Sequence, residues 1–337
     1  MTAEADNKPR PARTLDDLLA RYRAGDARAL GRLLTLVENQ HPEAGRALSA
    51  VYPLAHNAYR IGFTGAPGAG KSTLVSHVTG ALAAQGRAVA VLAMDPTSPF
   101  TGGALLGDRV RFQTPPDAEG VKPVFFRSAA SRGHTGGLSK TTEEMSVVLD
   151  AFGYERLLIE SVGVGQVGLD IAEACDTTVV VVVPESGDDV QALKAGLLEI
   201  ADILVVNKAD RPGAKALRQQ LEEAVHLRTK RQRHDWAPVV HMTCGQTGEG
   251  IPALVELIDT HHTHLLQQSG QETLRRDRLR RALLNLVREE LRVAAADAFR
   301  LGRLPGGGDL EHALDDILRG ERDPFGIARH AARRLID

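Results

Sequence analysis

Apolar and polar positions along the chain follow three successive patterns. From Leu15 to about Tyr52 the apolar residues recur at helical spacing, and Gly25 and the stretch "QHPEAG" divide that region into about three helices. Short β-rich runs then alternate with helical patterns as far as about residue 262. Beyond that point one apolar stripe runs along a long helix with arginines opposite, and its members are Leu279, Leu283, Leu286, Val287, Leu291, Ala294 and Ala298.

The middle region has the alternation typical of an α/β domain. Several of its strands are apolar throughout, the pattern of parallel strands buried on both faces, so we expect a P-loop-type core with a doubly wound, mainly parallel sheet. The predicted strands are "YRIGFTG", "AVAVLAMD", "VFFRSA", "ERLLIES", "TTVVVVVPE", "DILVVNK" and "PVVHMTC". The predicted crossover helices are "KSTLVSHVTGALAAQ", "TTEEMSVVLDAFG", "VQALKAGLLEIA" and "AKALRQQLEEAVHL".

These patterns divide the chain into four predicted parts. Residues 1–13 are expected to be a disordered tail, and residues 14–57 an N-terminal helical segment. Residues 58–262 form the predicted α/β domain, and residues 263–337 a C-terminal helical arm. Within the arm, "PGGG" ends the long helix, a shorter helix "DLEHALDDILRG" follows, and "DPFGIARHAARRLID" is expected to be a tail.

Composition restricts the functional class without choosing one. Lys and Arg number 41 against 43 Asp and Glu in 337 residues, so no basic nucleic-acid face is implied. The two cysteines, Cys175 and Cys244, are too few and too far apart for a secreted disulfide scaffold or a Cys-based metal site. The polar N-terminus has no apolar signal core, and the longest apolar run is too short to cross a bilayer. We therefore expect a cytoplasmic protein without membrane segments.

The stretch "GAPGAGKST" carries the most specific signal in the chain. It fits G-x-x-x-x-G-K-[ST] and lies between a predicted strand and a predicted helix, which is the context that this phosphate-binding loop requires. Its glycines let backbone N–H groups turn toward phosphate oxygens, and the helix N-terminus adds partial positive charge. Lys71 is expected over the β- and γ-phosphates, and the Ser72 hydroxyl on Mg²⁺. The predicted phosphate-binding residues are Gly65, Ala66, Pro67, Gly68, Ala69, Gly70, Lys71, Ser72 and Thr73.

A second stretch, "NKAD", indicates which base is bound. It follows the apolar strand "ILVV" and matches the N-K-x-D signature of GTPases. Asp210 can accept from guanine N1–H and the exocyclic amine, Asn207 is expected to brace neighbouring loops, and the stem of Lys208 to lie along the base. Downstream, "TCGQTGEG" is expected to supply a backbone N–H to guanine O6, and its first residues are Thr243, Cys244 and Gly245. Thr243 and Cys244 fit the usual Ser-Ala pair only loosely, and a small buried filler is an equal interpretation of Cys244.

Carboxylates at strand ends are the candidates for holding Mg²⁺ beside Ser72. They are Asp95 after "AVLAM", Asp108 in a glycine-rich loop, and Glu160, which opens "ESVGVGQ". Because Mg²⁺ keeps several waters, some of these acids are expected to act through water. In "ESVGVGQ", which resembles the D-x-x-G switch of GTPases, Gly163 is expected to donate to the γ-phosphate. Gln166 is a candidate for the catalytic water, with a packing or switch role equally open.

These motifs together resemble one family over nearly the whole chain. "GAPGAGKST", "DPTSPFTGGALLGDRVR", "RSAASRGHTGGLS", "ESVGVGQ" and "LLEIADILVVNKAD" occur in that order. The set resembles the MeaB/ArgK/MMAA family of P-loop GTPases, which are chaperones of adenosylcobalamin-dependent acyl-CoA mutases. The resemblance implies Mg²⁺-dependent GTP hydrolysis, a homodimer formed through the C-terminal arm, and control of cobalamin loading into a separate mutase such as methylmalonyl-CoA mutase. It also implies an adenosyltransferase as a further candidate partner.

The resemblance also suggests residues that the motifs alone do not give. It places the metal-binding acids on Asp95, Asp108 and Glu160, and a nucleotide-responsive switch loop on residues 184–194, with Lys194 as its functional lysine. Val167 and Gly168 replace the family's usual Ser-Glu, and "PESGDDVQ" departs from its usual loop, so the client mutase stays open. No D-x-H-x-x-G cobalamin motif occurs in this chain.

Two other functions remain as alternatives. A nickel metallochaperone GTPase of related fold would need a metal site, and the stretch "HHTH" (residues 261–264) is better interpreted as a polar surface run in a linker. A kinase acting on a small molecule or a protein would need an acceptor-binding domain, for which the sequence gives no sign.

Overall fold

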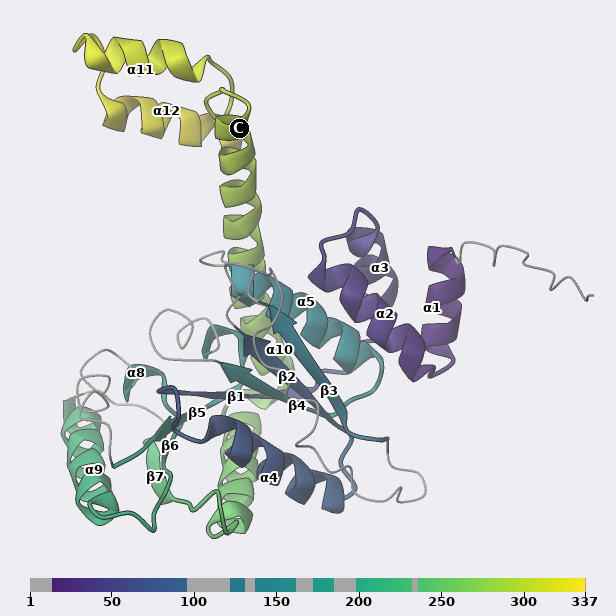
Figure 1. The fold of residues 1–337 in the computed structure, drawn as a ribbon, viewed down its shortest axis with the longest axis vertical. Helices are drawn as coiled ribbons and strands as arrows, with labels where there is room; N and C mark the ends of the chain where they lie inside the picture. Colours follow the sequence, from purple (N-terminus) through teal and green to yellow (C-terminus); the bar gives the residue numbers. More distant parts are fainter. Residues whose placement is uncertain are drawn as a thin grey trace, which may run out of the picture. The chain divides into compact units, whose positions relative to one another are not determined.

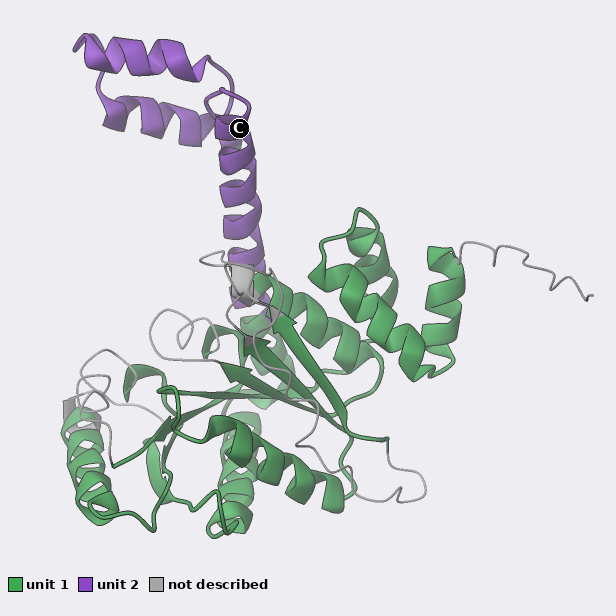
Figure 2. Cartoon of the chain, viewed as in Figure 1, with its two compact units in different colours: residues 1–278 green, residues 279–337 purple. Residues whose placement is uncertain are grey.

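The computed structural model describes residues 14–95, 122–130, 137–161, 172–184, 198–231 and 236–336. The chain divides into two compact units, residues 1–278 and residues 279–337, which Figure 2 shows in green and purple. Of the sequence predictions, the tail of residues 1–13 lies outside the described residues.

A seven-stranded parallel sheet forms the centre of the first unit (Figure 1). The strands lie in the order β3-β2-β4-β1-β5-β6-β7, and every neighbouring pair is parallel. All seven predicted strands are present. Their bounds are β1 (Tyr59–Gly65), β2 (Val89–Asp95), β3 (Phe125–Ala130), β4 (Arg156–Ser161), β5 (Thr177–Val182), β6 (Ile203–Val206) and β7 (Val239–Met242).

Helices cover both faces of this sheet and account for the remaining regular structure. The N-terminal segment forms α1 (Leu15–Arg23), α2 (Ala27–Glu38) and α3 (Ala44–Val51), followed by a short 3₁₀ turn, η1 (Tyr52–Leu54). The core and C-terminal helices are α4 (Lys71–Ala84), α5 (Gly137–Ala151), α8 (Leu198–Ile200), α9 (Ala214–Arg231), α10 (Ile251–Arg300), α11 (Leu310–Leu318) and α12 (Pro324–Ile336). The backbone of α10 leaves helical geometry at Gly270, whose φ is 70°.

Two local predictions were wrong. The "HHTH" stretch is not a linker, because it lies inside α10 and His261 is buried. The final "DPFGIARHAARRLID" is not a tail, because it forms α12, in which Ile327 and Ala331 are buried. In both places the sequence is rich in Arg and His, and the apolar residues that mark the buried face are few.

Successive strand residues pack on opposite faces of the sheet, as the period of a β-strand requires. On β4, Leu157 and Ile159 face the cluster that contains α2 and α5, whereas Leu158 faces the cluster that contains α4 and the start of α10. On β6, Leu204 and Val206 face α9, whereas Ile203 packs with α4 and α10. Apolar residues on both faces are what made these strands recognisable in the sequence.

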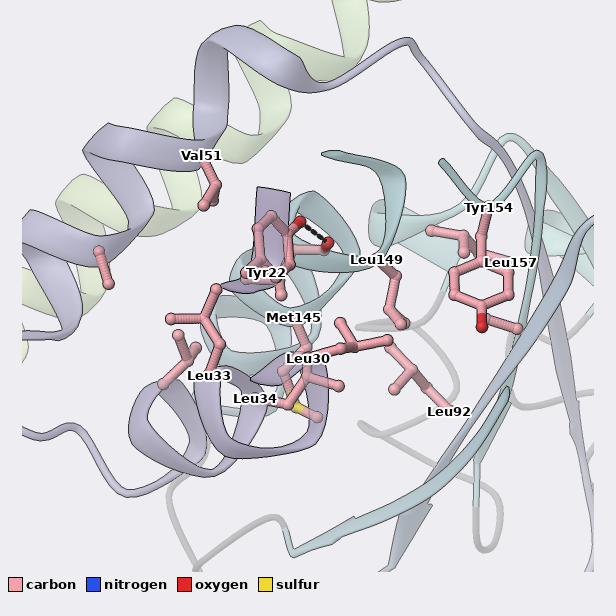
Figure 3. Close-up of a cluster of buried hydrophobic side chains, with 14 of the residues drawn as sticks. Tyr22, Leu30, Leu33, Leu34, Val51, Leu92, Met145, Leu149, Tyr154 and Leu157 are labelled. Carbon is pink, nitrogen blue, oxygen red and sulfur yellow. Dashed lines mark hydrogen bonds between the residues drawn. The ribbon is translucent and has the colours of Figure 1, made fainter. Parts of the chain in front are cut away.

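The three N-terminal helices belong to the same core as the sheet (Figure 3). Leu30, Leu33 and Leu34 of α2 are fully buried, and the stripe they form packs with Met145 and Leu149 of α5. Tyr22 of α1 is also buried, and its hydroxyl donates to the backbone oxygen of Val148 at 2.5 Å. A buried hydroxyl without a partner is costly, so this bond fixes α1 on α5. The N-terminal segment therefore holds α5 against the sheet.

His261 is a buried titratable group in the packing between α10 and the sheet. Its Nδ1 lies 2.6 Å from the hydroxyl of Thr177, and its ring packs against the indole of Trp236. Burial, with smaller contributions from His264 and His262, lowers the pKa of His261 from 6.5 to about 4. The carboxylate of Asp202, 3.6 Å from Nε2, favours the charged form but does not outweigh burial.

We expect folding stability to fall as the pH drops from about 6.5 toward 4. In that window the unfolded chain protonates His261 and the folded chain does not, so the unfolded state binds more protons and gains stability. The effect of this residue amounts to about 3 kcal/mol at most. Urea denaturation at pH 7 and pH 5 measures it for the wild type and His261→Asn. The variant should lose less stability on acidification, and an unchanged pH dependence would contradict the assignment.

Candidate functional site

The predicted chemical motifs lie at the carboxyl edge of the sheet. The phosphate-loop stretch follows β1, Glu160 lies near the end of β4, Asn207 follows β6, and Thr243 follows β7. Because all these strands are parallel, their carboxyl ends meet at one edge. The chain winds outward in opposite directions on the two sides of β1, which lies between β4 and β5. Ligands of doubly wound sheets bind in the crevice at such a point.

Two glycines of the phosphate-loop stretch have no alternative in this geometry. Gly65 has a φ of 145°, and a Cβ there would lie 2.1 Å from the backbone oxygen of Val181. Gly70, with a φ of 88°, precedes α4, and a Cβ there would lie 2.4 Å from Nδ2 of Asn207. The loop therefore depends on glycine for close approach as well as for its backbone conformation. Sequence analysis anticipated the second reason but not the first.

Lys71 lies at the first position of α4 with its ammonium group against the loop. Its Nζ donates to the backbone oxygens of Gly65 and Ala66, each at 2.9 Å, and the residue is buried. The N-terminus of α4 adds the partial positive charge of its first N–H groups. A buried ammonium at a helix N-terminus, under a glycine loop, favours an anionic ligand such as a phosphate.

Ser72 and Glu160 meet one residue further along the helix. The Ser72 hydroxyl donates to Oε1 of Glu160 at 2.6 Å, and Glu160 is buried at the end of β4. A hydroxyl and a carboxylate are oxygen ligands of the kind that Mg²⁺ takes, and Mg²⁺ uses few protein ligands when phosphate and water complete its shell. Among the described side chains no group of three or more His, Cys, Asp or Glu could hold a metal. The pair thus fits a cation that a phosphate ligand also coordinates.

The other predicted metal and switch residues are only partly described. Asp95 is the last residue of β2, which is hydrogen-bonded to β4, so its backbone lies at the same sheet edge as Glu160. Its side chain lies outside the described part of the structure. The same holds for the whole of Asp108, Gly163, Gln166 and Lys194.

Asn207 connects three loops at this edge. Its Nδ2 donates to the backbone oxygen of Ala69 in the phosphate loop at 2.8 Å. Its Oδ1 accepts from the backbone N–H of Gly245 at 3.1 Å and from the hydroxyl of Thr243 at 3.2 Å. The residue is buried, so each of these bonds replaces a contact with water. The side chain thus has the bracing contacts that the N-K-x-D motif predicts.

The backbone after Asn207 turns through a strained residue and exposes a carboxylate. Lys208 has a φ of 56°, which is uncommon for a residue with a side chain. Asp210 is exposed, and its Oδ1 accepts a hydrogen bond from the Cys244 thiol at 3.3 Å. The guanidinium of Arg211 lies 3.7 Å from its other oxygen. A carboxylate held in this way can accept from two donors of a planar base.

The structure distinguishes the roles of the residues at the start of "TCGQTGEG". Thr243 turns inward to Asn207, Cys244 contacts Asp210, and Gly245 presents its backbone beside both. Cys244 is therefore buried, as the filler interpretation requires, and is also in contact with a predicted base-reading residue. Sequence reasoning passed over Arg211 and His77, because one arginine or histidine without a motif carries no signal. His77 on α4 lies 2.9 Å from the Gly245 oxygen.

A cavity of about 440 Å³ lies at the opposite edge of the sheet, beside the residues that begin β1 and β4. Two of its acids already have partners. Asp176 accepts from Arg278 at 2.9 Å, and Asp150 accepts from the backbone N–H groups of His56 and Asn57. These contacts hold α10 and the entry to β1 in place. No predicted site residue lines this cavity.

Comparison with known proteins agrees with this geometry. Residues 30–299 match the family described as methylmalonyl Co-A mutase-associated GTPase MeaB. The chain belongs to the MeaB family. A MeaB-family chain is expected to carry a guanine-nucleotide site, and its phosphate loop, Ser72–Glu160 pair and N-K-x-D loop lie together where such a site requires them.

Several relatives of this MeaB-family chain are named as GTPases. A putative GTPase of Pyrococcus horikoshii is 42% identical over 323 residues, covering 96% of this chain and 98% of the relative. The GTPase ArgK of Escherichia coli is 37% identical over 238 residues, covering 68% of this chain and 70% of the relative. The mitochondrial methylmalonic aciduria type A homolog of Caenorhabditis briggsae is 30% identical over 295 residues, covering 82% and 71%.

Among solved structures, one titled LAO/AO transport system kinase superposes along nearly the entire chain. Its TM-score is 0.68 at 26% identity, and the match covers 96% of this chain and 98% of that one. The P-loop α/β fold with its helical extension is thus shared over the full length of that chain.

Replacing Asn207 should damage both folding and nucleotide binding. Asn207→Ala leaves the Ala69 oxygen and the Gly245 N–H without their buried partner, and we expect the free energy of unfolding to drop by about 2–4 kcal/mol. GDP affinity should fall at least about tenfold, because the phosphate and base loops are no longer joined. Urea denaturation and GDP titration measure both effects. Gln246→Ala, at an exposed position of the neighbouring loop, is the matched control. Equal behaviour of the two variants would refute the bracing role.

Proposed function

We propose that this MeaB-family protein binds Mg²⁺–GTP, hydrolyses it to GDP and phosphate, and uses the bound nucleotide to control an adenosylcobalamin-dependent acyl-CoA mutase. The observation that carries the proposal is the hydrogen bond from Asn207 to Ala69, which joins a phosphate loop to a guanine-type loop. A phosphate loop alone would leave the base open. Joined to Asp210 through the same motif, it supports a guanine nucleotide.

Binding of the triphosphate rests on Lys71 and the loop backbone. The N–H groups of residues 65–73 and the Lys71 ammonium would neutralise the β- and γ-phosphates. Phosphoryl transfer needs mainly positioning and charge stabilisation, so these groups would contribute to the transition state as well as to binding. Ser72 and Glu160 would hold Mg²⁺, together with Asp95 and Asp108. The cation, when bound, would stabilise charge that develops on the phosphate oxygens.

Other parts of the reaction belong to residues beyond the described ones. Gly163 is proposed to donate its N–H to the γ-phosphate, and Gln166 is proposed as the residue that orients the attacking water. Lys194 is proposed to relay nucleotide state. Their support is the match of this chain to the MeaB family over residues 30–299, which includes all three positions.

Recognition of guanine is assigned to Asp210, with the backbone of Gly245 beside it. Guanine offers N1–H and the 2-amino group to a carboxylate, whereas adenine offers no such pair. Cys244 and Arg211 flank the carboxylate and would fix its orientation. Asn207, Lys208 and Thr243 complete the proposed base pocket.

A mutase partner is supported by names in the family. The family description names a methylmalonyl Co-A mutase-associated GTPase, and one relative is named for methylmalonic aciduria. On this basis the client of this chain is proposed to be an adenosylcobalamin-dependent acyl-CoA mutase, with an adenosyltransferase as a further partner. None of the described helices is both long and apolar enough to cross a membrane.

A homodimer is supported by the second unit considered by itself. Its helices enclose an apolar groove of about 370 Å³, lined by residues such as Phe299, Leu310 and Ile327. Leu318 and Phe325 are 85% and 75% exposed there. Large apolar side chains left in water are typical of surfaces that bind another protein. We propose that a second copy of this arm covers them.

Substituting Asp210 tests the guanine assignment. In Asp210→Asn the amide donates where the carboxylate accepted, so it suits the C2 carbonyl of xanthine and opposes the 2-amino group of guanine. We expect GTP affinity to fall at least about tenfold and XTP affinity to rise, since one lost charge-assisted hydrogen bond costs about 1.5–3 kcal/mol. Competition against a fluorescent nucleotide measures both. Asp315→Asn, on exposed α11, is the control. An unchanged GTP-to-XTP ratio would rule out this base contact.

Nucleotide-dependent binding of a mutase tests the partner assignment. Immobilised protein loaded with Mg²⁺ and a non-hydrolysable GTP analogue, with GDP, or with neither, is mixed with purified adenosylcobalamin-dependent methylmalonyl-CoA mutase. We expect the retained mutase to differ between the loaded states. Lys71→Ala should abolish the difference, because its phosphate loop lacks the ammonium. Equal retention by wild type in all states would count against nucleotide control, and absence of retention would require the same test with mutases for other branched or hydroxylated acyl-CoA substrates.

A further inference from the structure

His77 joins the phosphate-binding helix to the loop that lies beside the base-reading carboxylate. It is on α4, six positions after Lys71, and one of its ring nitrogens, Nε2, lies 2.9 Å from the backbone oxygen of Gly245. A carbonyl oxygen can only accept, so Nε2 carries the proton in this contact. The histidine side chain therefore donates from α4 to the loop of residues 243–250.

A second contact places the same helix face under the loop. Thr73 and His77 are four positions apart, so their side chains lie on one face of α4. A Cβ on Gly245 would lie 3.3 Å from the methyl group of Thr73, and one on Gly248 would lie 3.9 Å from the His77 ring. The loop thus rests on α4 over two of its glycines. Larger side chains at Gly245 would displace it from the helix.

Gly245 is held from both sides of its peptide backbone. Asn207 accepts from its N–H at 3.1 Å, and His77 donates to its C=O. The preceding residue, Cys244, contacts Asp210. A shift of Gly245 would therefore move the group next to the carboxylate that we propose reads the base.

We propose that His77 is a positioning residue for guanine recognition, which sets the base loop relative to the phosphates through the rigid helix that both share. The inference rests on the proposed function. A helix rises about 1.5 Å per residue, so His77 lies roughly 9 Å along α4 from Lys71. One end of the helix holds the phosphates and this later turn holds the base loop, which fixes the distance between the two halves of the nucleotide site.

The test compares His77→Ala with His77→Gln, whose amide N–H reaches about as far as Nε2. His77 is exposed, so neither substitution opens the core. We expect His77→Ala to bind GDP about 3- to 10-fold more weakly in Mg²⁺, the range that corresponds to one net hydrogen bond. His77→Gln should restore most of this loss. The adjacent Ser76→Ala serves as the control on the same helix.

Two further ligands separate positioning of the base from a general effect on the helix. IDP keeps the C6 oxygen of guanine but lacks the 2-amino group, so it should lose the same factor as GDP in His77→Ala if the loop backbone meets that oxygen. Inorganic triphosphate in Mg²⁺ engages no base loop and should bind equally well to both proteins. Calorimetric titration measures all three ligands.

Each alternative result has one meaning. GDP binding by His77→Ala at wild-type strength, or an equal loss of triphosphate binding, would overturn the positioning role while leaving the guanine site intact. Failure of His77→Gln to recover affinity would overturn the role of the hydrogen bond. Failure of the wild-type protein itself to bind GDP would overturn the proposed function, and this inference with it.

Discussion

The hydrogen bond between Asn207 Nδ2 and the Ala69 oxygen is the contact on which the candidate site depends. It joins two loops 138 residues apart in the sequence, across the carboxyl ends of β1 and β6. The contact also explains Gly70, because any side chain at that position would occupy the space of the asparagine amide. A single buried amide thus requires one glycine and orients two further residues, Thr243 and Gly245. Loss of such a group costs more than one exposed surface contact, because its partners are left buried without water.

The parallel sheet makes this convergence possible. Each strand delivers its next loop to the same edge, so residues from β1, β4, β6 and β7 meet without any long loop having to cross the sheet. The core holds that edge rigid from both faces, with α4 and the start of α10 on one and α5 with the N-terminal helices on the other. Polar side chains such as Lys71 and Glu160 can then be buried at the rim, where hydrogen bonds replace their water.

How far the sequence predicts this structure depends on where the signal lies. All seven strands could be predicted, because residues such as Val179–Val182 are apolar on both faces, and the phosphate loop because its glycines are contiguous with Lys71. The "HHTH" stretch misled, because burial of His261 depends on Thr177 and Trp236, which come from distant parts of the chain. The helix α12 was missed for a similar reason, since arginines outnumber its buried apolar residues. His77 could not be found, because its partner is a backbone oxygen and leaves no trace in side-chain pattern.

The helix α4 has two functions that the motif alone does not require. Its first turn presents Lys71 and Ser72 to one end of the nucleotide site, and its second turn contacts the loop of Cys244 and Gly245 at the other. A loop held only by Asn207 could rotate about that single side chain. A second attachment through α4 removes this freedom, and it does so from the same rigid element that sets the phosphate position. Selectivity for a base then follows from where the loop is held as well as from the carboxylate of Asp210, because a misplaced donor or acceptor discriminates poorly between purines.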